Sequence, residues 1–382
     1  MKPLVLFVTS HPLSIQSFLL PHFRVLKSEY DIRVMVNTTA PSISPIADDA
    51  LVEHLPIRRK LSPYYDLWAL LKLTLRIYRL KPLVVHTITP KAGLIGMLAA
   101  WLACVPLRVH TFTGQVWVTR TGFVRWSLRL TDRLIAVLAT NVVVDSRSQC
   151  RFLINEGVID PSTAVVLGRG SVCGVDIWRF VPAFSTRARI RAQFRTSNNA
   201  IVCLYLGRLS RDKGLLDLAR AFECVATRQP RAQLWIVGPE EDLSYSEIVD
   251  LMPLNRGRLR RADLTERPET FMQAADLFCL PSYREGFGST VIEAAACGVP
   301  ALVSRIYGLA DTIIEGETGW MHEPGNVVEL VEILDKLLSR PEEVKEKGKK
   351  AREFVTNTYS QTTVVEEMFQ FYRRLTADWN KP

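Results

Sequence analysis

Short runs of Val, Ile and Leu alternate along the chain with longer segments in which apolar residues recur at helical spacing. The short runs are apolar at consecutive positions, which is typical of strands buried on both faces of a parallel sheet. Such strands, separated by helices, predict an α/β protein built from strand–helix–strand units. The predicted strands lie at 4–9, 32–36, 51–55, 83–86, 107–111, 141–145, 163–167, 200–206, 232–237, 276–280, 300–303 and 319–322. The predicted helices lie at 64–80, 91–103, 123–138, 214–228, 289–297, 326–338 and 362–379.

The alternation is interrupted once, between residues 178 and 198. This stretch is polar, basic and without a clear apolar period, and a new series of strands begins at Ala200. We therefore expect two doubly wound, Rossmann-like domains facing a cleft, with residues 1–180 in the first and 181–360 in the second. The last segment, 361–382, has the pattern of an amphipathic helix. Ligands of such sheets bind beyond the carboxyl ends of the strands, so we expect functional residues in those loops.

The composition of the 382 residues is globular, with 48% hydrophobic and 23% charged residues. It excludes collagen-like, coiled-coil and disordered chains. The net charge of +9 is uneven, because residues 1–180 carry 21 Lys and Arg against 11 Asp and Glu, whereas residues 181–382 carry 27 against 28. This excess predicts that the first half meets an anionic surface or ligand: nucleic acid, anionic lipid or a phosphorylated substrate. Nucleic acid is the least favoured, since no binding motif for it is present.

Export and membrane spanning are not indicated by the apolar segments. The N-terminus has one Lys and a short apolar run, which does not match a signal peptide. The longest apolar stretch, 94–105, is too short to span a bilayer. Seven cysteines occur without the spacing of a zinc or redox motif, as expected for buried free thiols in a reducing compartment. We therefore expect a cytoplasmic protein whose contact with any membrane is peripheral.

The first candidate site follows the strand predicted at 200–206, in the sequence LYLGRLSRDKG. Gly207 permits a close approach of backbone or ligand. Arg208 and Lys213 precede a helix, where the helix dipole repels cations. Their presence there is explained if an anion such as a phosphate lies between them. The alternative is that both side chains are solvated, with Asp212 as a compensating helix cap.

The second candidate site is the loop and helix start PSYREGFGSTVIEAAACG, residues 281–298. Gly286 and Gly288 leave backbone amides free near the start of the helix, which favours an anion. Glu285 and Glu293 would then be two carboxylates at the rim of one pocket, each able to accept hydrogen bonds from hydroxyl groups. The alternative is a capping box, in which Glu293 only caps its own helix.

Together, the spacings G-R-x4-K-G and E-x7-E resemble the donor-binding half of the family 4 retaining glycosyltransferases, which have the GT-B fold of two Rossmann-like domains. The resemblance implies that Arg208 and Lys213 hold the diphosphate of a nucleotide-sugar donor. It also implies that Glu285 contacts the transferred sugar and that Glu293 binds the ribose hydroxyls. The other donor-binding residues that it implies are Gly207, Gly286, Phe287, Gly288, Ser289 and Thr290.

The resemblance extends more loosely to the C-terminus. In GT-B enzymes the last helix crosses back to pack on the first domain. The segment 361–382 would do so here, and its aromatic residues would be the anchors of that packing. These residues are Phe369, Tyr372 and Trp379.

Three loops at predicted strand ends supply candidate residues for an acceptor. In the first, Ser10 and His11 stand where many family members have a glycine pair; the alternative is a polar turn with Ser14 as a helix cap. In the second, Lys91 opens a helix, where either an anion or solvent would face it. In the third, His110 ends a strand and is similar to the family's active-site histidine, with a structural histidine as the alternative. The acceptor-binding set implied is Ser10, His11, Lys91 and Arg120, and the catalytic set is His110, Glu285, Arg208 and Lys213.

Basic residues also cluster on one predicted helix of the first half. Arg125, Arg129 and Arg133 recur every four residues and form a single stripe. Phe123 and Trp126 are interleaved with them. Basic residues flanked by aromatic ones suit an anionic membrane interface. The alternative is an ordinary solvated helix face.

The family resemblance implies a particular reaction. A hexose or N-acetylhexosamine would pass from a UDP-sugar to a polyprenyl-diphosphate-linked saccharide, with retention of configuration, in the assembly of a bacterial surface polysaccharide. The enzyme would work peripherally on the inner face of the cytoplasmic membrane. No D-x-D sequence is present, so neither a metal nor another cofactor is expected. The expected partners are the donor, the lipid-linked acceptor and an anionic membrane surface, and not nucleic acid.

Three other functions remain open at this stage. A nucleotide-sugar epimerase of the same fold would form an epimer without any acceptor. A membrane-binding protein with a dead site would sediment with anionic vesicles and release no UDP. An NAD-dependent dehydrogenase would share the Rossmann-like sheets, but the first strand is not followed by G-x-G-x-x-G.

Overall fold

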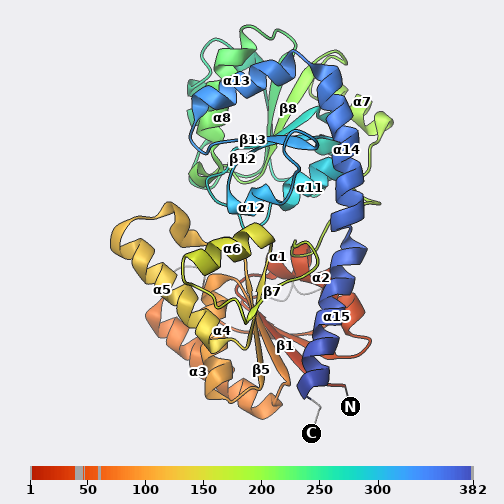
Figure 1. Cartoon of the computed structure of the whole chain (residues 1–382). Coiled ribbons are helices and arrows are strands. Elements are labelled where there is room, and N and C mark those ends of the chain that lie inside the picture. Colours follow the sequence, from red (N-terminus) through yellow and green to blue (C-terminus); the bar gives the residue numbers. More distant parts are fainter. Residues whose placement is uncertain (1, 39–45, 47, 59–61, 380–382) are drawn as a thin grey trace. The chain divides into compact units, whose positions relative to one another are not determined.

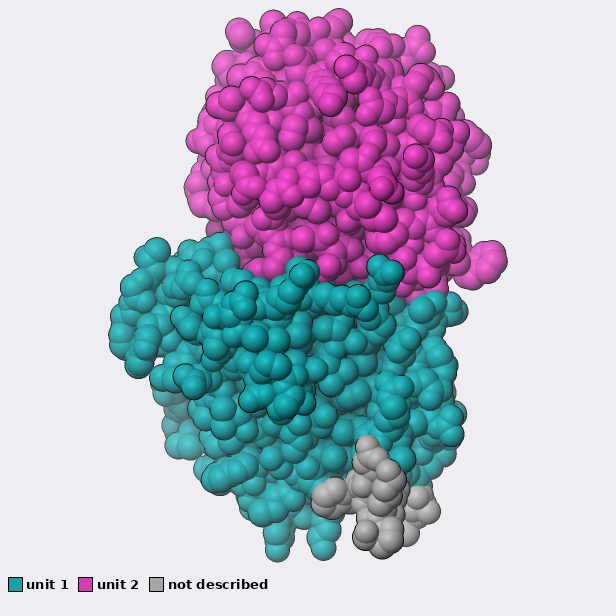
Figure 2. Space-filling model, viewed as in Figure 1, with its two compact units in different colours: residues 1–174, 361–382 teal, residues 175–360 magenta. Residues whose placement is uncertain are grey.

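The computed structural model describes residues 2–38, 46, 48–58 and 62–379. The chain divides into two compact units, one formed by residues 1–174 with 361–382 and the other by residues 175–360 (Figure 1, Figure 2). Each unit is built around its own parallel sheet. The division falls after Gly174, earlier than the boundary expected at 180.

Seven parallel strands form the sheet of the first unit, in the order β3-β2-β1-β4-β5-β6-β7. The order reverses between β1 and β4, which pair directly, with Val5 beside Val84. This reversal is the switch point of the sheet, the place at which doubly wound folds bind their ligands. The strands are β1 (Leu4–Thr9), β2 (Asp31–Val36), β3 (Leu51–His54), β4 (Val84–Ile88), β5 (Leu107–Phe112), β6 (Asn141–Val144) and β7 (Ala164–Val166).

Helices cover both faces of this sheet (Figure 1). On one face, Leu73 and Ile135 pack against Leu6 of the sheet. On the other face, Phe23 and Tyr372 pack around Phe7. The first face carries α3 (Pro63–Leu80), α4 (Pro90–Leu102), α5 (Gly122–Leu138) and α6 (Arg147–Asn155), and the second carries α2 (Leu20–Leu26) and α15 (Gln361–Trp379). The described part of this unit also has the short helices α1 (Pro12–Ser14), the π-helical η1 (Ile15–Leu19) and the 3-10 helix η3 (Val116–Thr119).

The C-terminal helix α15 is anchored to the first unit by polar as well as apolar contacts. The Tyr372 hydroxyl lies 2.6 Å from Nδ1 of His86 on β4. Tyr30 and Thr376 share a buried hydroxyl–hydroxyl bond of 3.0 Å. Phe369 packs partly buried beside them, and the side chain of Trp379 lies outside the described part of the chain.

Six parallel strands form the sheet of the second unit, in the order β10-β9-β8-β11-β12-β13. Its switch point lies between β8 and β11, where Leu277 is beside Cys203. The strands are β8 (Ile201–Leu206), β9 (Ala232–Val237), β10 (Leu259–Ala262), β11 (Leu277–Leu280), β12 (Ala301–Ser304) and β13 (Gly319–His322). The helices are α7 (Phe184–Gln193), α8 (Leu215–Ala226), α9 (Tyr245–Asp250), α10 (Pro268–Ala274), α11 (Ser289–Ala296), α12 (Tyr307–Ala310), α13 (Val327–Leu338) and α14 (Pro341–Tyr359), with 3-10 turns η4 (Arg211–Lys213) and η5 (Arg256–Arg258).

The two doubly wound sheets confirm the predicted fold class, but two elements differ from the expectation. The interval 178–198, taken as an unpatterned boundary, contains the helix α7, which packs on α10. Only Ile190 and Arg191 of its ten residues are buried, and Arg191 is 1% exposed and pairs with Asp276 at 2.6 Å. The edge strand β10 was not predicted either, because only Leu259 of its four residues is buried and two others are arginines. Apolar periodicity cannot detect elements whose packing side chains are charged.

The described helices include none that is both long enough and apolar enough to cross a bilayer. All seven cysteines are free thiols. Cys104 and Cys224 are exposed, so the expectation that the thiols are buried is wrong for these two.

Candidate active site

The loops that follow β8 and β11 meet at the switch point of the second unit. Gly214 ends the first loop in a left-handed conformation with φ of +67°. A Cβ atom there would lie 1.9 Å from the carbonyl oxygen of Pro281, at the end of β11. Only glycine therefore allows the two loops to approach this closely. The contact brings the first sequence-predicted site, around Lys213, against the second, around Glu285.

Lys213 and Glu285 form an ion pair in these joined loops. Nζ of Lys213 lies 2.7 Å from Oε1 of Glu285, and the hydroxyl of Ser282 donates to the same oxygen at 2.9 Å. The two side chains are only 15% and 13% exposed. The alternative of a solvated Lys213 is therefore wrong. An ammonium group and a carboxylate stand together, accessible on one side, at the place where the fold binds ligands.

Asp212 also holds the two loops together. It accepts hydrogen bonds from the Ser210 hydroxyl at 2.7 Å and from the guanidinium of Arg284 at 2.6 Å. Burial favours a raised pKa for Asp212, but Ser210, Arg284 and Lys213 outweigh it and lower the pKa. The carboxylate is therefore ionised at neutral pH and is neutralised by Arg284, rather than serving as a helix cap beside two solvated cations.

Arg208 lies in a different ion pair from that of Lys213. Its guanidinium donates to the carboxylate of Glu241, in the loop after β9, and the arginine side chain is 45% exposed. Gly207 precedes it, and a Cβ atom on Gly238 would lie 2.0 Å from the carbonyl oxygen of Gly207. The loops after β8 and β9 therefore pack closely through their backbones, and this packing places Arg208 beside Glu241.

Glu293 lies on α11, away from the helix start. The helix begins after Gly288 and has no side-chain cap, so the capping-box alternative is wrong. Burial raises the pKa of Glu293 to about 8; Arg179 opposes this shift and Glu269 adds to it. At neutral pH the carboxyl therefore holds a proton and can both donate and accept a hydrogen bond, which suits a ligand with hydroxyl groups.

In the segment from Gly286 to Gly288 and at the start of α11, backbone amides that the sequence suggested were free are hydrogen-bonded within the protein. The amide of Gly288 donates to the carbonyl of Gly308 at 3.0 Å, and that of Ser289 donates to the carbonyl of Phe287 at 2.9 Å. These two amides, expected to be free for an anion, are already paired. The Phe287 side chain is 8% exposed and packs on the ring of Tyr359 at 5.4 Å. Its observed role is packing. Gly286 and Thr290 keep partial exposure in the same segment.

Two of the acceptor candidates lie at the switch point of the first unit. The hydroxyl of Ser10, after β1, lies 3.1 Å from the hydroxyl of Thr89, after β4, and so joins the two diverging loops. His11 caps the short turn α1, since its Nδ1 accepts a hydrogen bond from the amide of Leu13 at 3.2 Å. Ser14 ends that turn and precedes the π-helix η1, but its side chain makes no capping hydrogen bond there, so the alternative that Ser14 is the cap is wrong.

Lys91 and Arg120 lie in different surroundings from each other. Lys91 is 17% exposed and pairs with Asp66 of α3 at 2.8 Å, so it is not simply solvated. Arg120 is exposed and follows the turn η3. Asp66 was not singled out from the sequence, because helical spacing alone does not show which carboxylate faces the start of α4.

His110 is buried inside the sheet. The strand β5 continues to Phe112, so the expectation that His110 ends a strand is wrong. Its side chain is 1% exposed, and its Nδ1 lies 2.7 Å from the hydroxyl of Thr87. A Cβ atom on Gly93 would lie 2.5 Å from its Cε1, so α4 covers the ring closely. Burial lowers the pKa of His110 to about 3, and the imidazole is therefore neutral at physiological pH.

Sequence reasoning gave no role to several residues that contact the candidates of each unit. They are Ser282 and Arg284 in the second unit and Asp66 and Thr87 in the first. The first two flank Glu285 in its own loop, and their polar nature beside a strand end was an available signal. The others come from neighbouring strands or helices, and only the order of strands in the sheet reveals them. Among the described residues, no cluster of three His, Cys, Asp or Glu side chains suits a metal ion.

Comparisons with known proteins match both units. The family model described as "Glycosyl transferases group 1" matches residues 186–354, and the "Glycosyl transferase 4-like domain" matches residues 26–170. The two matches together identify the protein as a glycosyltransferase. Among curated relatives, this glycosyltransferase is 29% identical over 326 residues to the capsular polysaccharide biosynthesis glycosyltransferase CapM of Staphylococcus aureus, covering 85% of each chain. It is 28% identical over 302 residues to UDP-Gal:alpha-D-GlcNAc-diphosphoundecaprenol alpha-1,3-galactosyltransferase of Escherichia coli, covering 77% of this chain and 76% of the relative.

Solved structures of similar fold cover almost the whole glycosyltransferase. Anabaena Alr3699/HepE in complex with UDP and glucose matches with a TM-score of 0.80 at 17% identity, over 98% of this chain and all of the other. Sucrose-phosphate synthase of Thermosynechococcus elongatus matches with a TM-score of 0.80 at 21% identity, over 99% and 100%. These likenesses confirm the predicted GT-B fold, and the family matches confirm that the protein is a glycosyltransferase. The epimerase, dehydrogenase and non-catalytic alternatives gain no support.

Proposed function

We propose that this enzyme is a retaining glycosyltransferase that moves a hexose or N-acetylhexosamine from a UDP-sugar to a polyprenyl-diphosphate-linked saccharide. The names of two relatives support the two substrates, since one is a galactosyltransferase named for UDP-Gal and a diphosphoundecaprenol-linked acceptor and the other is a glycosyltransferase of capsular polysaccharide synthesis. The observation that carries the proposal is the Lys213–Glu285 pair at the switch point of the second unit.

The cations of this site fit the departure of a nucleoside diphosphate. Lys213 and Arg208 each hold one carboxylate partner, which a bound diphosphate would replace as the counter-charge. In the reaction, the bond between the anomeric carbon and the diphosphate oxygen breaks, and a bond to the acceptor hydroxyl forms on the same face. The acceptor proton passes to the leaving diphosphate oxygen. The two cations stabilise the negative charge that develops there, without a metal ion.

The carboxyl groups of the site fit the polyol parts of the donor. Glu293, protonated at neutral pH because burial raises its pKa to about 8, would both accept from and donate to the ribose hydroxyls. Glu285, released from Lys213 by the diphosphate, would accept a hydrogen bond from a sugar hydroxyl. Gly207, Gly286 and the start of α11 would border the same ligand.

The switch point of the first unit fits the acceptor. Ser10 and His11 offer hydroxyl and imidazole groups there, and Lys91 offers a cation that Asp66 now neutralises. Arg120, which follows η3, adds a guanidinium group from the same unit. His110 would act from within the sheet as a neutral hydrogen-bonding group, since its pKa is lowered to about 3. An acceptor joined to a lipid would place the enzyme peripherally on the inner face of the cytoplasmic membrane.

A panel of nucleotide sugars tests the proposal. Each is offered with a polyprenyl-diphosphate-linked sugar, and products are identified by mass and by the configuration of the new bond. We expect one UDP-sugar to extend the acceptor with retention. Release of an epimer without an acceptor, or inversion at the anomeric carbon, would contradict the proposal. Where Lys213 or Arg208 is replaced by Ala, Arg305→Ala is the control. Arg305 is another partly exposed arginine of the second unit that is paired with a carboxylate.

A further inference from the structure

The helix α3 of the first unit is apolar on two opposite sides. Its inward row, Ala69, Leu73 and Ile77, is buried against the sheet and α4. At 100° per residue, a second apolar row lies on the side that faces away from the core. A helix at the surface ordinarily presents polar residues on that side. The outward row, with exposed fractions, is Tyr64 (79%), Leu67 (57%), Leu71 (51%), Leu75 (59%) and Tyr78 (70%).

The helix α5 repeats this arrangement with the same spacing. Its buried side includes Asp132, Ile135 and Ala136. Its outward apolar residues again stand at positions i, i+3, i+7, i+11 and i+14, as they do on α3. Two helices with one pattern indicate a surface built for contact rather than scattered exposure. This second outward row is Phe123 (76%), Trp126 (59%), Leu130 (48%), Leu134 (45%) and Val137 (72%).

The two outward rows belong to one face of the first unit. The helix α4 packs against α3 on one side and against α5 on the other, and all three cover the same face of the sheet (Figure 1). The end of α4 adds Trp101 and Leu102, which are 52% and 51% exposed. We call the two rows with these two residues the α3/α5 surface.

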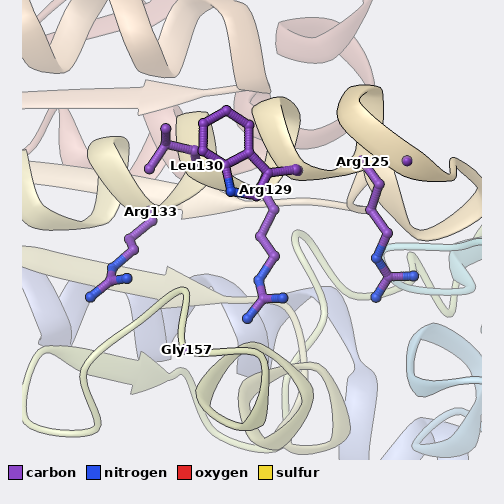
Figure 3. A pocket seen from close by; sticks show the side chains of 7 residues that line it. Arg125, Arg129, Leu130, Arg133 and Gly157 are labelled. Atoms are coloured by element: carbon purple, nitrogen blue, oxygen red, sulfur yellow. The ribbon is translucent and has the colours of Figure 1, made fainter.

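Positive charge borders the α3/α5 surface. On α5 the side chains of Arg125, Arg129 and Arg133 extend together to one side, whereas Leu130 points to another (Figure 3). These arginines line a hollow of about 360 Å³ together with Trp126 and Gly157. Glu156 pairs with Arg125 and Arg129, so the hollow keeps a net positive charge. On α3, Lys72, Arg76 and Arg79 lie on one flank of the outward row, and Glu53 neutralises Arg76, so Lys72 and Arg79 supply the positive charge of this flank.

We propose that the α3/α5 surface docks on an anionic lipid bilayer, with the two apolar rows at the boundary of headgroups and acyl chains and the arginine hollow against a lipid phosphate. Aromatic rings at the ends of the rows and basic residues beside them are what such an interface favours. A second copy of the chain fits less well, because a two-fold contact would set arginines against arginines. This inference rests on the proposed function in one respect only, namely that the acceptor is linked to a lipid.

Vesicle sedimentation without donor or acceptor tests the docking surface separately from catalysis. The vesicles contain phosphatidylcholine with phosphatidylglycerol, and the variants are Leu71→Ser with Leu75→Ser on one row and Leu130→Ser with Leu134→Ser on the other. We expect each pair to weaken binding roughly tenfold. Leu254→Ser is the matched control, since Leu254 is 81% exposed on the second unit. The replaced leucines are about half exposed, so the variants should fold, which thermal melting checks.

Unchanged vesicle binding by both paired variants would overturn the docking proposal. So would a concentration-dependent dimer in analytical ultracentrifugation that the variants abolish while vesicle binding stays intact. A protein that binds vesicles through this surface but transfers no sugar to any acceptor would instead contradict the proposed function alone. Transfer to a short-chain, water-soluble acceptor should survive in the variants, because their lesion lies in docking.

Discussion

At the scale of single residues, the cations of the second unit are the most direct test of the chemistry. We expect Lys213→Ala to lower kcat about a hundredfold or more, because it removes a charge that stabilises the leaving diphosphate. Steady-state assays with saturating donor measure the effect, with Arg305→Ala as the control. A Lys213→Ala enzyme that keeps most of its kcat, with an unchanged melting temperature, would remove Lys213 from the mechanism.

Replacing Glu241 should improve donor binding, whereas replacing Lys213 should impair catalysis. Glu241 neutralises Arg208 in the structure, so a donor diphosphate must replace it there. We expect Glu241→Gln to lower the KM for the donor, by about two- to fivefold, because the pair is partly exposed and such pairs are weak. The gain should vanish in an Arg208→Ala background. A KM that rises in Glu241→Gln would show that the carboxylate helps to bind the donor.

Glu293 predicts a pH effect on stability. Its pKa is about 8 in the folded protein and ordinarily 4.5, so between these values the folded state holds a proton that the unfolded state has lost. The contribution of Glu293 to stability is therefore complete below about pH 4.5 and declines as the pH rises toward 8. We expect Glu293→Gln to gain in unfolding free energy relative to wild type between pH 5 and pH 9, by roughly 1–3 kcal/mol. Urea titrations at both pH values measure this, and a constant difference would contradict it.

At the scale of elements, the helix α7 shows a stabilising role for a buried arginine. Arg191 donates to Asp276 at 2.6 Å and to the carbonyls of Ala274 and Ala200 at 3.0 and 2.9 Å. We expect Arg191→Ala to cost about 2–4 kcal/mol of unfolding free energy, because it opens a cavity and removes a buried donor from Asp276 and from the carbonyls, although Arg187 and the amide of Val202 still bond to Asp276. Arg189→Ala, exposed on the same helix, should have almost no effect. Chemical denaturation compares them, and equal stability of the two variants would contradict this role.

The same elements show what the sequence could and could not predict. Strands such as β1 and β8 were predicted because their consecutive apolar residues are buried on both faces. The elements α7 and β10 were missed because each has a single buried apolar residue, Ile190 and Leu259, with arginines beside it, and such a pattern is also that of a loop. For the site, the loop positions of Lys213 and Glu285 follow from local sequence. Their contact depends on Gly214 and on the strand order, and those are properties of the folded sheet.

At the scale of the whole molecule, part of the excess positive charge of the first half can be placed on a particular surface. Residues 1–180 hold an excess of ten positive charges, and part of it borders the α3/α5 surface. A surface that joins apolar rows to basic flanks has two contributions to its affinity for lipid. The electrostatic one is screened by salt within about 10 Å at 0.1 M, whereas the apolar one is not.

The two contributions predict that charge variants and apolar variants lose vesicle affinity in different ways. We expect added salt to weaken the binding of the wild type to anionic vesicles, and we expect Arg129→Glu with Arg133→Glu to bind weakly at low salt and to respond little to further salt. The paired serine variants should instead keep a salt response at lower overall affinity. Arg256→Glu, a comparable exposed arginine of the second unit, should behave as wild type. Sedimentation across a salt series measures all of these. Equal effects of Arg256→Glu and of the α5 pair would show that net charge alone, rather than this face of the first unit, attracts the protein to lipid.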